Sequence, residues 1–482
     1  MSDTTRNYVS GQWIESATGE TIEVENPARP SEVVARYQDS STEDATEGVE
    51  AAADAADDWA ATPGPERGRI LREAATLLAE RKDELTDLLV AEEGKANAEA
   101  GGEVQRAIDI FYHFAVKAAE RGGTVKNPSS PNQNLYTIEE PVGVAALITP
   151  WNYPIAIPAW KLAPALAAGN TVVLKPASAA PGVAMEIARA LDEAGLPDGV
   201  LNVVTGSGSV VGTEFIEHDA VGRRLVHRQQ RSRRDGVRPS DRLRQARSDG
   251  TRREEPDHRR RFGRPRRSGR PRRERRVRRH RAGLYGVFPC HRPRGRPRRV
   301  VAELVDRAES IDIGPGDEHE MGPQVSESEL ESTLDYVEVA EAEGATLVSG
   351  GGIPEGSAVE SGYFVEPTVF TDVDSEMRIA QEEVFGPLVA VIAVSDFDEA
   401  LAVANDVEYG LAASIVTDDH TEANRFVREA ESGVVKVNDK TTGLELHVPF
   451  GGFKRSSSET WREQGDEGLD FYTIEKTVYD NY

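Results

Sequence analysis

The chain has 482 residues, 38% of them hydrophobic and 29% charged, with a formal net charge of −26. That length allows two or more domains with sizeable cores. The single cysteine excludes an internal disulfide framework, and neither a signal-peptide pattern nor an apolar run long enough to span a bilayer is present. We therefore expect a cytoplasmic protein with no membrane partner.

The charge is distributed very unevenly. Residues 222–299 contain 31 Arg, no Lys and 7 acidic residues, a net of +24. The rest of the chain carries 76 acids and 26 bases, a net of −50. Such an acid excess makes a protein repel itself, and salt screens the repulsion. The composition predicts a halophilic protein in a high-salt cytoplasm, with an ordinary acidic enzyme as the alternative.

The first half of the chain has the patterning of alternating strands and helices. A hairpin-like start over the first forty residues precedes apolar spacings of three and four over 42–120, which predict helices. Further along, "VGVAALI" and "NTVVLK" read as buried strands, separated by a helix that ends at Gly169. The stretch "GVAMEIARALDEAGLPDGV", residues 182–200, reads as another helix, and "LNVVTGSG" reads as the next strand. This order predicts an α/β fold, a parallel sheet with helices on both faces.

The pattern stops at about Gly222 and resumes at about Val300. Between them no apolar period of 2 or 3.6 is present, and Arg, Pro, Gly and Ser dominate. A segment of that composition cannot build a core. We expect 222–299 to be poorly packed coil that leaves neighbouring apolar faces uncovered and is cut first by proteases.

Several motifs resemble those of the NAD(P)-dependent aldehyde dehydrogenase superfamily. They are "ITPWNYPIAIPAWKLAPALAAGNTVVLKPAS", "QEEVFGPLVAVI" and "HVPFGGFKRSSS", supported by "NPARPSEVVARYQ" and "EMGPQV". The resemblance covers residues 5–221 and 300–482. It implies a Rossmann-type cofactor domain, a catalytic α/β domain and a β oligomerisation arm. The corresponding ranges are 1–122 and 142–221 for the cofactor domain, 222–299 for the aberrant segment, 300–453 for the rest of the catalytic domain, and 123–141 with 466–482 for the arm.

The resemblance also implies a reaction. A cysteine thiolate attacks an aldehyde, hydride passes to the nicotinamide of NAD or NADP, and a glutamate-activated water releases the carboxylate. Asn152 matches the family's oxyanion donor, and Trp151 resembles the position that lines the cofactor site. From the residues alone, Asn152 could instead be a turn residue before a proline, and Trp151 could be core packing.

Further positions match the family's cofactor contacts. Lys175 emerges from the carboxyl end of a strand, where it could bond ribose or phosphate or simply be solvated. Many NAD-preferring members carry glutamate where this chain has Ser178, and a hydroxyl tolerates the 2′-phosphate of NADP. Glu383 matches the ribose-binding carboxylate and Phe385 the aromatic near the nicotinamide, with a surface acid and a core ring as alternatives. The loop "TGSGSVVG" contributes three glycines on the way to a helix, Gly206, Gly208 and Gly212.

The segment "GLELHVPFGGFKRSSSE" is similar to the semialdehyde branch, particularly enzymes that oxidise 2,5-dioxopentanoate (α-ketoglutarate semialdehyde). The β-rich tail "LDFYTIEKTVYDNY" implies, by the same resemblance, a homodimer or homotetramer. No metal site and no specific nucleic-acid partner are expected, because the arginine run lacks zinc-ligand spacing, a recognition helix and an aromatic platform.

The arginine-rich segment stands where the family carries an "FTGS"-like turn, an "ELGGK"-like segment with the general base and a "GQ-x-C-T"-like segment with the nucleophile. The flanking motifs keep about the family's separation, so the segment replaces these elements. A shifted reading frame explains it: in a GC-rich gene, GACGAC for two aspartates contains CGACGA, which encodes Arg-Arg. The absence of A-rich lysine codons agrees with this interpretation.

Three residues of this segment lie near the expected catalytic positions without the family's context. Cys290 stands in "VFPCHRPRG", and Glu254 and Glu255 lack the base's flanking motif. We assign none of them a role, and we expect the written chain to be inactive. The alternative hypothesis is a non-catalytic dehydrogenase scaffold that has gained a nucleic-acid-binding segment, which would require base-selective binding that is lost when 222–299 is deleted.

Overall fold

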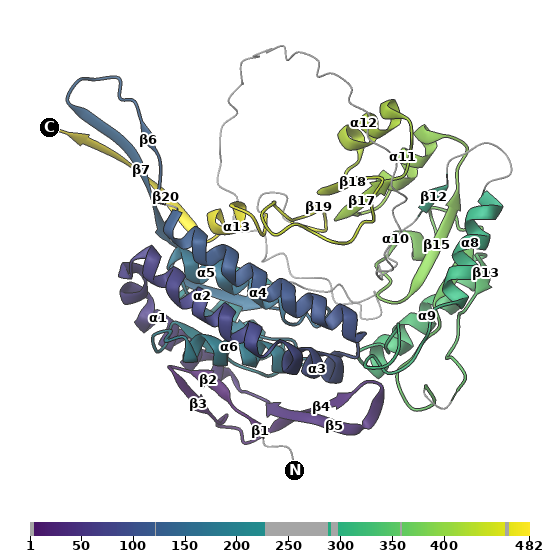
Figure 1. Cartoon of the computed structure of the whole chain (residues 1–482), viewed down its shortest axis with the longest axis horizontal. Coiled ribbons are helices and arrows are strands. Elements are labelled where there is room, and N and C mark those ends of the chain that lie inside the picture. The colour runs from purple at the N-terminus through teal and green to yellow at the C-terminus, as the bar shows by residue number, and fades with distance from the viewer. Residues whose placement is uncertain (1–3, 121, 227–287, 291–296, 357–358, 458–461) are drawn as a thin grey trace. The chain divides into compact units, whose positions relative to one another are not determined.

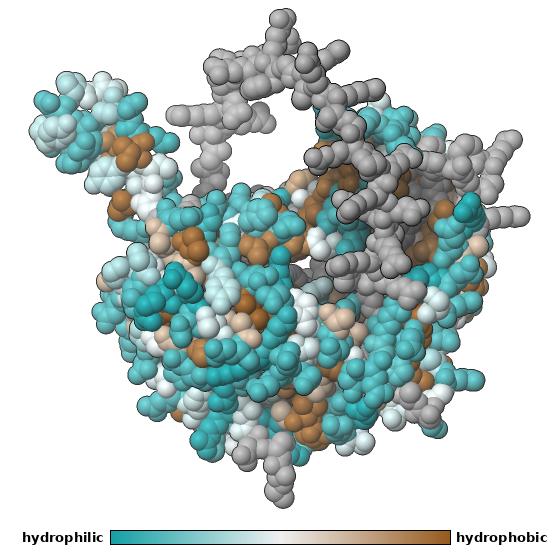
Figure 2. Space-filling model, viewed as in Figure 1, coloured by the Kyte–Doolittle hydropathy of each residue, from teal (hydrophilic) through white to brown (hydrophobic). Residues whose placement is uncertain are grey.

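A computed structural model describes residues 4–120, 122–226, 288–290, 297–356, 359–457 and 462–482 (Figure 1). All of these residues belong to one compact unit. Within them, no helix combines the length and apolar character needed to cross a membrane. The face drawn in Figure 2 is mostly hydrophilic, with scattered hydrophobic patches.

A six-stranded sheet organises the N-terminal half, in the order β11-β8-β9-β10-β2-β3. The first four strands in this order are mutually parallel, β2 pairs antiparallel with β10, and β3 pairs antiparallel with β2. The bounds are β2 Asn7–Val9, β3 Gln12–Ile14, β8 Val144–Ile148, β9 Thr171–Lys175, β10 Leu201–Val203 and β11 Val221–Val226.

Helices cover both faces of this sheet, which confirms the predicted fold class. On β9, Val172 and Leu174 face one hydrophobic core while Val173, between them, faces the other. The first core takes residues from α2 Gly64–Glu80, α3 Lys82–Glu93, α4 Asn97–Glu120, α5 Ala156–Ala168 and α6 Gly182–Glu193. The second takes them from α1 Thr42–Ala61 and α7 Val211–Glu217. Alternate side chains of one strand thus enter opposite cores, as strand geometry requires.

The predicted hairpin at the start of the chain is also present. Strand β4 (Thr21–Asn26) pairs antiparallel with β5 (Arg29–Gln38), and β1 (Thr4–Thr5) adds parallel to β5. Gly169 has a φ of 96° and ends α5 in the left-handed conformation, as predicted.

Two strands from residues 125–141 and one from the C-terminal end form a three-stranded antiparallel arm. Strand β20 (Thr473–Asn481) pairs along its whole length with β7 (Gln133–Pro141), and β6 (Val125–Lys126) lies on the other side of β7. The short helix α13 (Glu467–Asp470) precedes β20, and Leu469, Phe471 and Tyr472 belong to the core of the N-terminal sheet. The arm therefore starts at Thr473, although our sequence range for it begins at residue 466.

A second sheet, in the order β12-β15-β14-β13, organises the C-terminal half. Its faces are covered by α8 and α9, and the small parallel pair β17–β18 packs against α11 and α12. The bounds are β12 Phe288–Cys290, α8 Pro297–Glu309, α9 Glu327–Glu343, β13 Thr346–Ser349, β14 Thr368–Thr371, α10 Arg378–Gln381, β15 Leu388–Ala393, α11 Phe397–Asn405, β16 Tyr409–Gly410, β17 Ala412–Ile415, α12 His420–Glu429, β18 Val434–Val437 and β19 Phe453–Lys454.

Regular structure extends further into the arginine-rich segment than we predicted. Strand β11 continues past Val221 to Val226, paired with β8 around a bulge, β12 ends at Cys290, and α8 starts at Pro297. A strand edge offers backbone hydrogen bonds to any non-proline residue, so composition alone did not locate the boundary. The coil prediction for residues 227–287 and 291–296 lies outside the described residues.

Candidate active site

Two neighbouring parallel strands of the N-terminal sheet end together. Ile148, the last residue of β8, pairs with Lys175, the last residue of β9, and the amide of Thr149 donates to the carbonyl of Lys175 over 3.2 Å. The loops that carry Trp151 and Ser178 therefore begin at the same edge. In open α/β sheets, ligands bind at this carboxyl edge.

Lys175 and Ser178 form a small polar cluster there. The Lys175 ammonium donates to the carbonyl of Pro176 over 2.8 Å and lies 3.5 Å from the Ser178 hydroxyl, which donates to the carbonyl of Gly206 over 3.0 Å. Burial lowers the pKa of Lys175 to about 8. In the described part of the chain no carboxylate forms an ion pair with this ammonium. A desolvated cation with only neutral partners is suited to an anionic ligand.

The glycines of the following loop differ in what they require. Gly206 has a φ of 140°, and a Cβ there would lie 3.0 Å from the backbone nitrogen of Ser40. A Cβ on Gly212 would lie 3.3 Å from Ile148, close to the Lys175 side chain. Nothing lies within 4 Å of the position a Cβ on Gly208 would take. Gly206 thus allows close packing against the backbone of Ser40, and Gly212 allows it against Ile148, whereas Gly208 borders open space.

Asn152 lies in the loop between β8 and α5 and is partly exposed. Its side-chain Oδ1 is buried and has no hydrogen-bond partner among the described residues. Its backbone carbonyl, in contrast, accepts a hydrogen bond from the Lys95 ammonium over 3.0 Å. The backbone of Asn152 is therefore anchored, while its carboxamide can turn toward a ligand.

Contacts with the C-terminal half complete the arrangement. The rings of Trp151 and Phe385 meet edge to face, with centroids 5.0 Å apart. Of the two adjacent glutamates, Glu382 binds Arg378 and Tyr336, so it has a structural role. Glu383 makes no hydrogen bond or ion pair with another described residue, and although its side chain is exposed, nearby protein atoms remove enough water to raise its pKa. Its carboxylate is available for a ligand.

Sequence reasoning missed the buried charges around this site. Lys95 and Glu103 form an ion pair beneath the Asn152 loop, and Lys161 pairs with Glu463 over 2.8 Å with no exposed side-chain area. Lys161 interrupts the otherwise apolar "AIPAWKLAPALAA", a signal that could have been read. Lys95 stands in the polar run "EEGKAN", where no pattern indicates burial.

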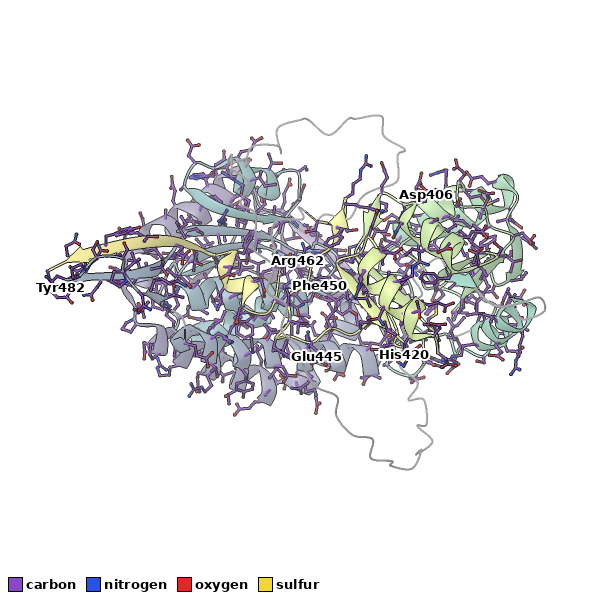
Figure 3. The ribbon with its side chains drawn as sticks, turned by 90° about the horizontal axis from the view of Figure 1, so that it is seen from above. Asp406, His420, Glu445, Phe450, Arg462 and Tyr482 are labelled. Carbon is purple, nitrogen blue, oxygen red and sulfur yellow. The ribbon has the colours of Figure 1, made fainter. Side chains whose placement is uncertain are left out.

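The catalytic nucleophile and base are not identified in the described residues. Cys290 ends the short strand β12, of which only the backbone is described, and Glu254 and Glu255 lie outside the described residues. The described residues show two surface depressions, one on α12 beside His420 and one near Asp406. Figure 3 labels both residues. Neither depression is lined by a predicted site residue.

Comparison with known proteins identifies the family. Residues 13–223 and 293–478 match the aldehyde dehydrogenase family. The chain belongs to this family. The unmatched residues 224–292 fall within the arginine-rich segment. By family, the protein is an oxidoreductase that converts aldehydes to carboxylates with NAD or NADP.

The most similar relatives include two archaeal proteins. The chain is 68% identical over 489 residues to the α-ketoglutarate semialdehyde dehydrogenase of Haloferax volcanii, covering 100% of both chains. It is 37% identical to the 2,5-dioxopentanoate dehydrogenase of Saccharolobus solfataricus, covering 98% of this chain and 99% of that one.

Solved structures agree on the fold. A point mutant of betaine aldehyde dehydrogenase from Staphylococcus aureus, in complex with NAD+, superposes with a TM-score of 0.83 at 28% identity, covering 99% of this chain and 96% of the other. A 3,6-anhydro-L-galactose dehydrogenase in complex with NADP also gives a TM-score of 0.83 at 28% identity, covering 99% and 100%.

Proposed function

We propose that this protein descends from a dehydrogenase that oxidises a semialdehyde, 2,5-dioxopentanoate or a close analogue, to the corresponding carboxylate. The observation that carries the proposal is the 68% identity to an α-ketoglutarate semialdehyde dehydrogenase over the full length of both chains. Relatives with the same activity in their names, from Bacillus subtilis and Saccharolobus solfataricus, are 36% and 37% identical.

The cofactor occupies the carboxyl edge of the N-terminal sheet in this proposal. Lys175 and Ser178 hold the adenosine ribose or its 2′-phosphate, and the loop from Gly206 to Gly212, Gly208 included, lies against the pyrophosphate. The carboxylate of Glu383 binds the nicotinamide ribose, and the Trp151–Phe385 pair packs near the nicotinamide. When bound, NAD or NADP supplies the hydride acceptor. The buried ammonium of Lys175, with no carboxylate partner among the described residues, supports use of NADP as well as NAD.

Asn152 is the oxyanion donor in this scheme. Its carboxamide donates a hydrogen bond without changing charge, at the moment when negative charge grows on the aldehyde oxygen. The unpartnered Oδ1 agrees with a side chain that is not committed to the protein's own hydrogen bonding. The thiol that attacks the aldehyde and the carboxylate that activates water belong to motifs absent from the sequence.

We further propose that residues 222–299 are a misread version of the catalytic segment, so the chain as written is inactive. The aldehyde dehydrogenase match breaks off at residue 223 and resumes at 293. The alignment with the Haloferax relative needs only 489 positions to cover both chains, which supports replacement of the segment over insertion. Loss of such a nucleophile costs several orders of magnitude in rate.

The test exchanges this segment. A chimera in which residues 222–299 are replaced by the corresponding residues of the Haloferax volcanii relative should form NAD(P)H from 2,5-dioxopentanoate, while the chain as written should form none. A matched Cys290→Ser variant of the written chain is the control. Turnover by the written chain that this variant abolishes would show that Cys290 is the nucleophile, and turnover that survives it would refute the chemistry proposed here.

We also propose a homodimer or homotetramer. The arm of β6, β7 and β20 is joined to the rest of the molecule only at its base and carries the exposed side chains of Ile474 and Tyr479 (Figure 3, near Tyr482). Apolar residues on such an edge are typical of an interface. Light scattering during size-exclusion chromatography should give two or four times the monomer mass of 52.5 kDa, and a single monomeric peak would contradict the proposal.

A further inference from the structure

A buried cluster of three ionisable side chains lies beneath the loop that carries Asn152. Lys95 stands in the connection between α3 and α4, and its ammonium lies 2.6 Å from the carboxylate of Glu103 and 3.6 Å from that of Glu93. The three side chains are only 11%, 1% and 9% exposed. Charges are removed from water at such a cost only where each one has partners.

The remaining contacts of this cluster are with the Asn152 loop. The Lys95 ammonium donates to the carbonyl of Asn152 over 3.0 Å and lies 4.8 Å from the ring centroid of Tyr153. The other oxygen of Glu103 accepts the amides of Ile155 and Ala156, at 3.0 and 3.1 Å. Because Ile155 provides no side-chain cap for α5, Glu103 replaces that cap. The pair therefore anchors the loop at two points, one in its middle and one at its end.

The electrostatics of the cluster favour a single ion pair. Burial raises the pKa of Glu93 to about 8, so this carboxyl is mostly protonated at neutral pH. The positive charge of Lys95 is then matched by Glu103 alone. A one-to-one pair with defined hydrogen bonds has one preferred geometry, which suits an anchor.

The backbone that carries Lys95 is itself tightly held. Gly94 has a φ of 86°, and a Cβ added to Gly322 would come within 1.7 Å of its carbonyl oxygen. The amide of Asn97 donates to the carbonyl of Gly316 over 2.7 Å. Residues of the C-terminal half thus fix the connection from which Lys95 reaches the loop.

We propose that Lys95 is a positioning residue for the aldehyde reaction. Paired with Glu103, it fixes the backbone of Asn152 so that the carboxamide faces the oxygen of the bound aldehyde. The inference rests on the proposed function only in the role given to Asn152. It gives a residue of the connection between α3 and α4 a role in the site, and none of the sequence motifs indicated that role.

Hydrogen–deuterium exchange on the full-length chain tests the anchor without requiring activity. In Lys95→Met, the amides within residues 151–157 should exchange at least tenfold faster than in the unmodified protein, while those of α1 stay unchanged. Lys161→Met is the control, because it removes another buried ammonium that forms an ion pair, in this case from α5. It should leave the exchange of 151–154 unchanged.

A second variant covers the possibility that an unpaired Glu103 unfolds the protein. Lys95→Met combined with Glu103→Gln removes both charges, and the glutamine oxygen can still accept from Ile155 and Ala156. Exchange at these two amides should return to the rate of the unmodified protein. The amides of 151–153 should still exchange fast, because the hydrogen bond from Lys95 to the Asn152 carbonyl is missing. Unchanged exchange at 151–153 in the folded double variant overturns the proposal. If the Lys95 variants exchange fast at 151–153 but the chimera with the Haloferax volcanii segment forms no NAD(P)H, only the proposed function is contradicted.

Discussion

The N-terminal sheet and the β17–β18 pair differ in how completely the described residues cover them. Every residue of β9 is buried, because α1 and α7 cover one face and α5 and α6 the other. In the β17–β18 pair only one face packs against α11 and α12, and Leu411 and Val416 beside β17 are 44% and 84% exposed. Most residues of the two cores around β9 come from the chain before residue 222, joined by Leu469, Phe471 and Tyr472. The C-terminal half follows the arginine-rich segment.

This difference indicates which half can keep its part of the site. Among the described residues, the two cores of the N-terminal sheet include no member of the segment 222–299, which contributes only most of the edge strand β11. The part of the site in the N-terminal half that binds the cofactor should therefore be intact in the chain as written. The part that carries out the reaction should depend on residues 222–299, which the chimera replaces. Four measurements test this difference between the two halves.

The largest expected effect is on catalysis by the restored chimera. Asn152→Ala should lower kcat by about 10²- to 10³-fold, as for loss of one oxyanion donor. The KM for NAD(P) should change little, since the side chain contacts the reacting oxygen. Steady-state kinetics measures both constants, with the exposed Asn134→Ala as control. An unchanged kcat would remove Asn152 from the site.

Core substitutions compare the two regions directly. Leu174 in β9 has no exposed area, so Leu174→Ala should lower the free energy of unfolding by about 2–5 kcal/mol. Leu411→Ala, at a residue 44% exposed, should change it by less than about 0.5 kcal/mol. Guanidinium unfolding gives both values. Similar losses at the two positions would show that β17 is covered by residues not seen to contact it here.

Cofactor preference tests whether the N-terminal half is intact. Lys175→Met should weaken NADP+ binding by about tenfold or more, since a charge-assisted hydrogen bond is worth about 1.5–3 kcal/mol, and should affect NAD+ less. Because burial lowers the pKa of Lys175 to about 8, only the protonated form below that pH attracts a phosphate. The NADP+ affinity of the unmodified protein should therefore fall as pH rises through 8. Isothermal titration that finds equal pH dependence for both cofactors would exclude this role.

The smallest effect concerns the pH dependence of stability in the N-terminal half. Glu92 accepts hydrogen bonds from the hydroxyl of Tyr37 and the amide of Gly182, and burial raises its pKa from 4.5 to about 7. Because the folded state binds this proton more tightly, its contribution is complete below pH 4.5 and is lost as pH rises to about 7. Glu92→Gln should flatten that decline by on the order of 1 kcal/mol for each pH unit. The measurement is the free energy of unfolding as a function of pH across this range. The same slope in the variant and in the unmodified protein would contradict the prediction.

Much of the fold was predictable because its signals are local. Period-2 and period-3.6 patterns placed the strands and helices up to Val203, and Gly169 indicated where α5 ends. For the site, the sequence offered predictions only where a family motif marks a position, as at Asn152 and Lys175, and these stay predictions. The boundary of the arginine-rich segment was misplaced, because β11 continues along an available strand edge whatever its composition.

The alternating α/β order, the family motifs and the uneven charge can be read from the residues alone, since they depend on residue type and spacing along the chain. Only the tertiary structure decided that Lys95 and Glu103 lie beneath Asn152, that Trp151 meets Phe385, and that Glu383 is available while Glu382 is paired. Those facts depend on which distant segments share a neighbourhood. A buried charge takes its role from partners far away in the chain, and no local pattern records them.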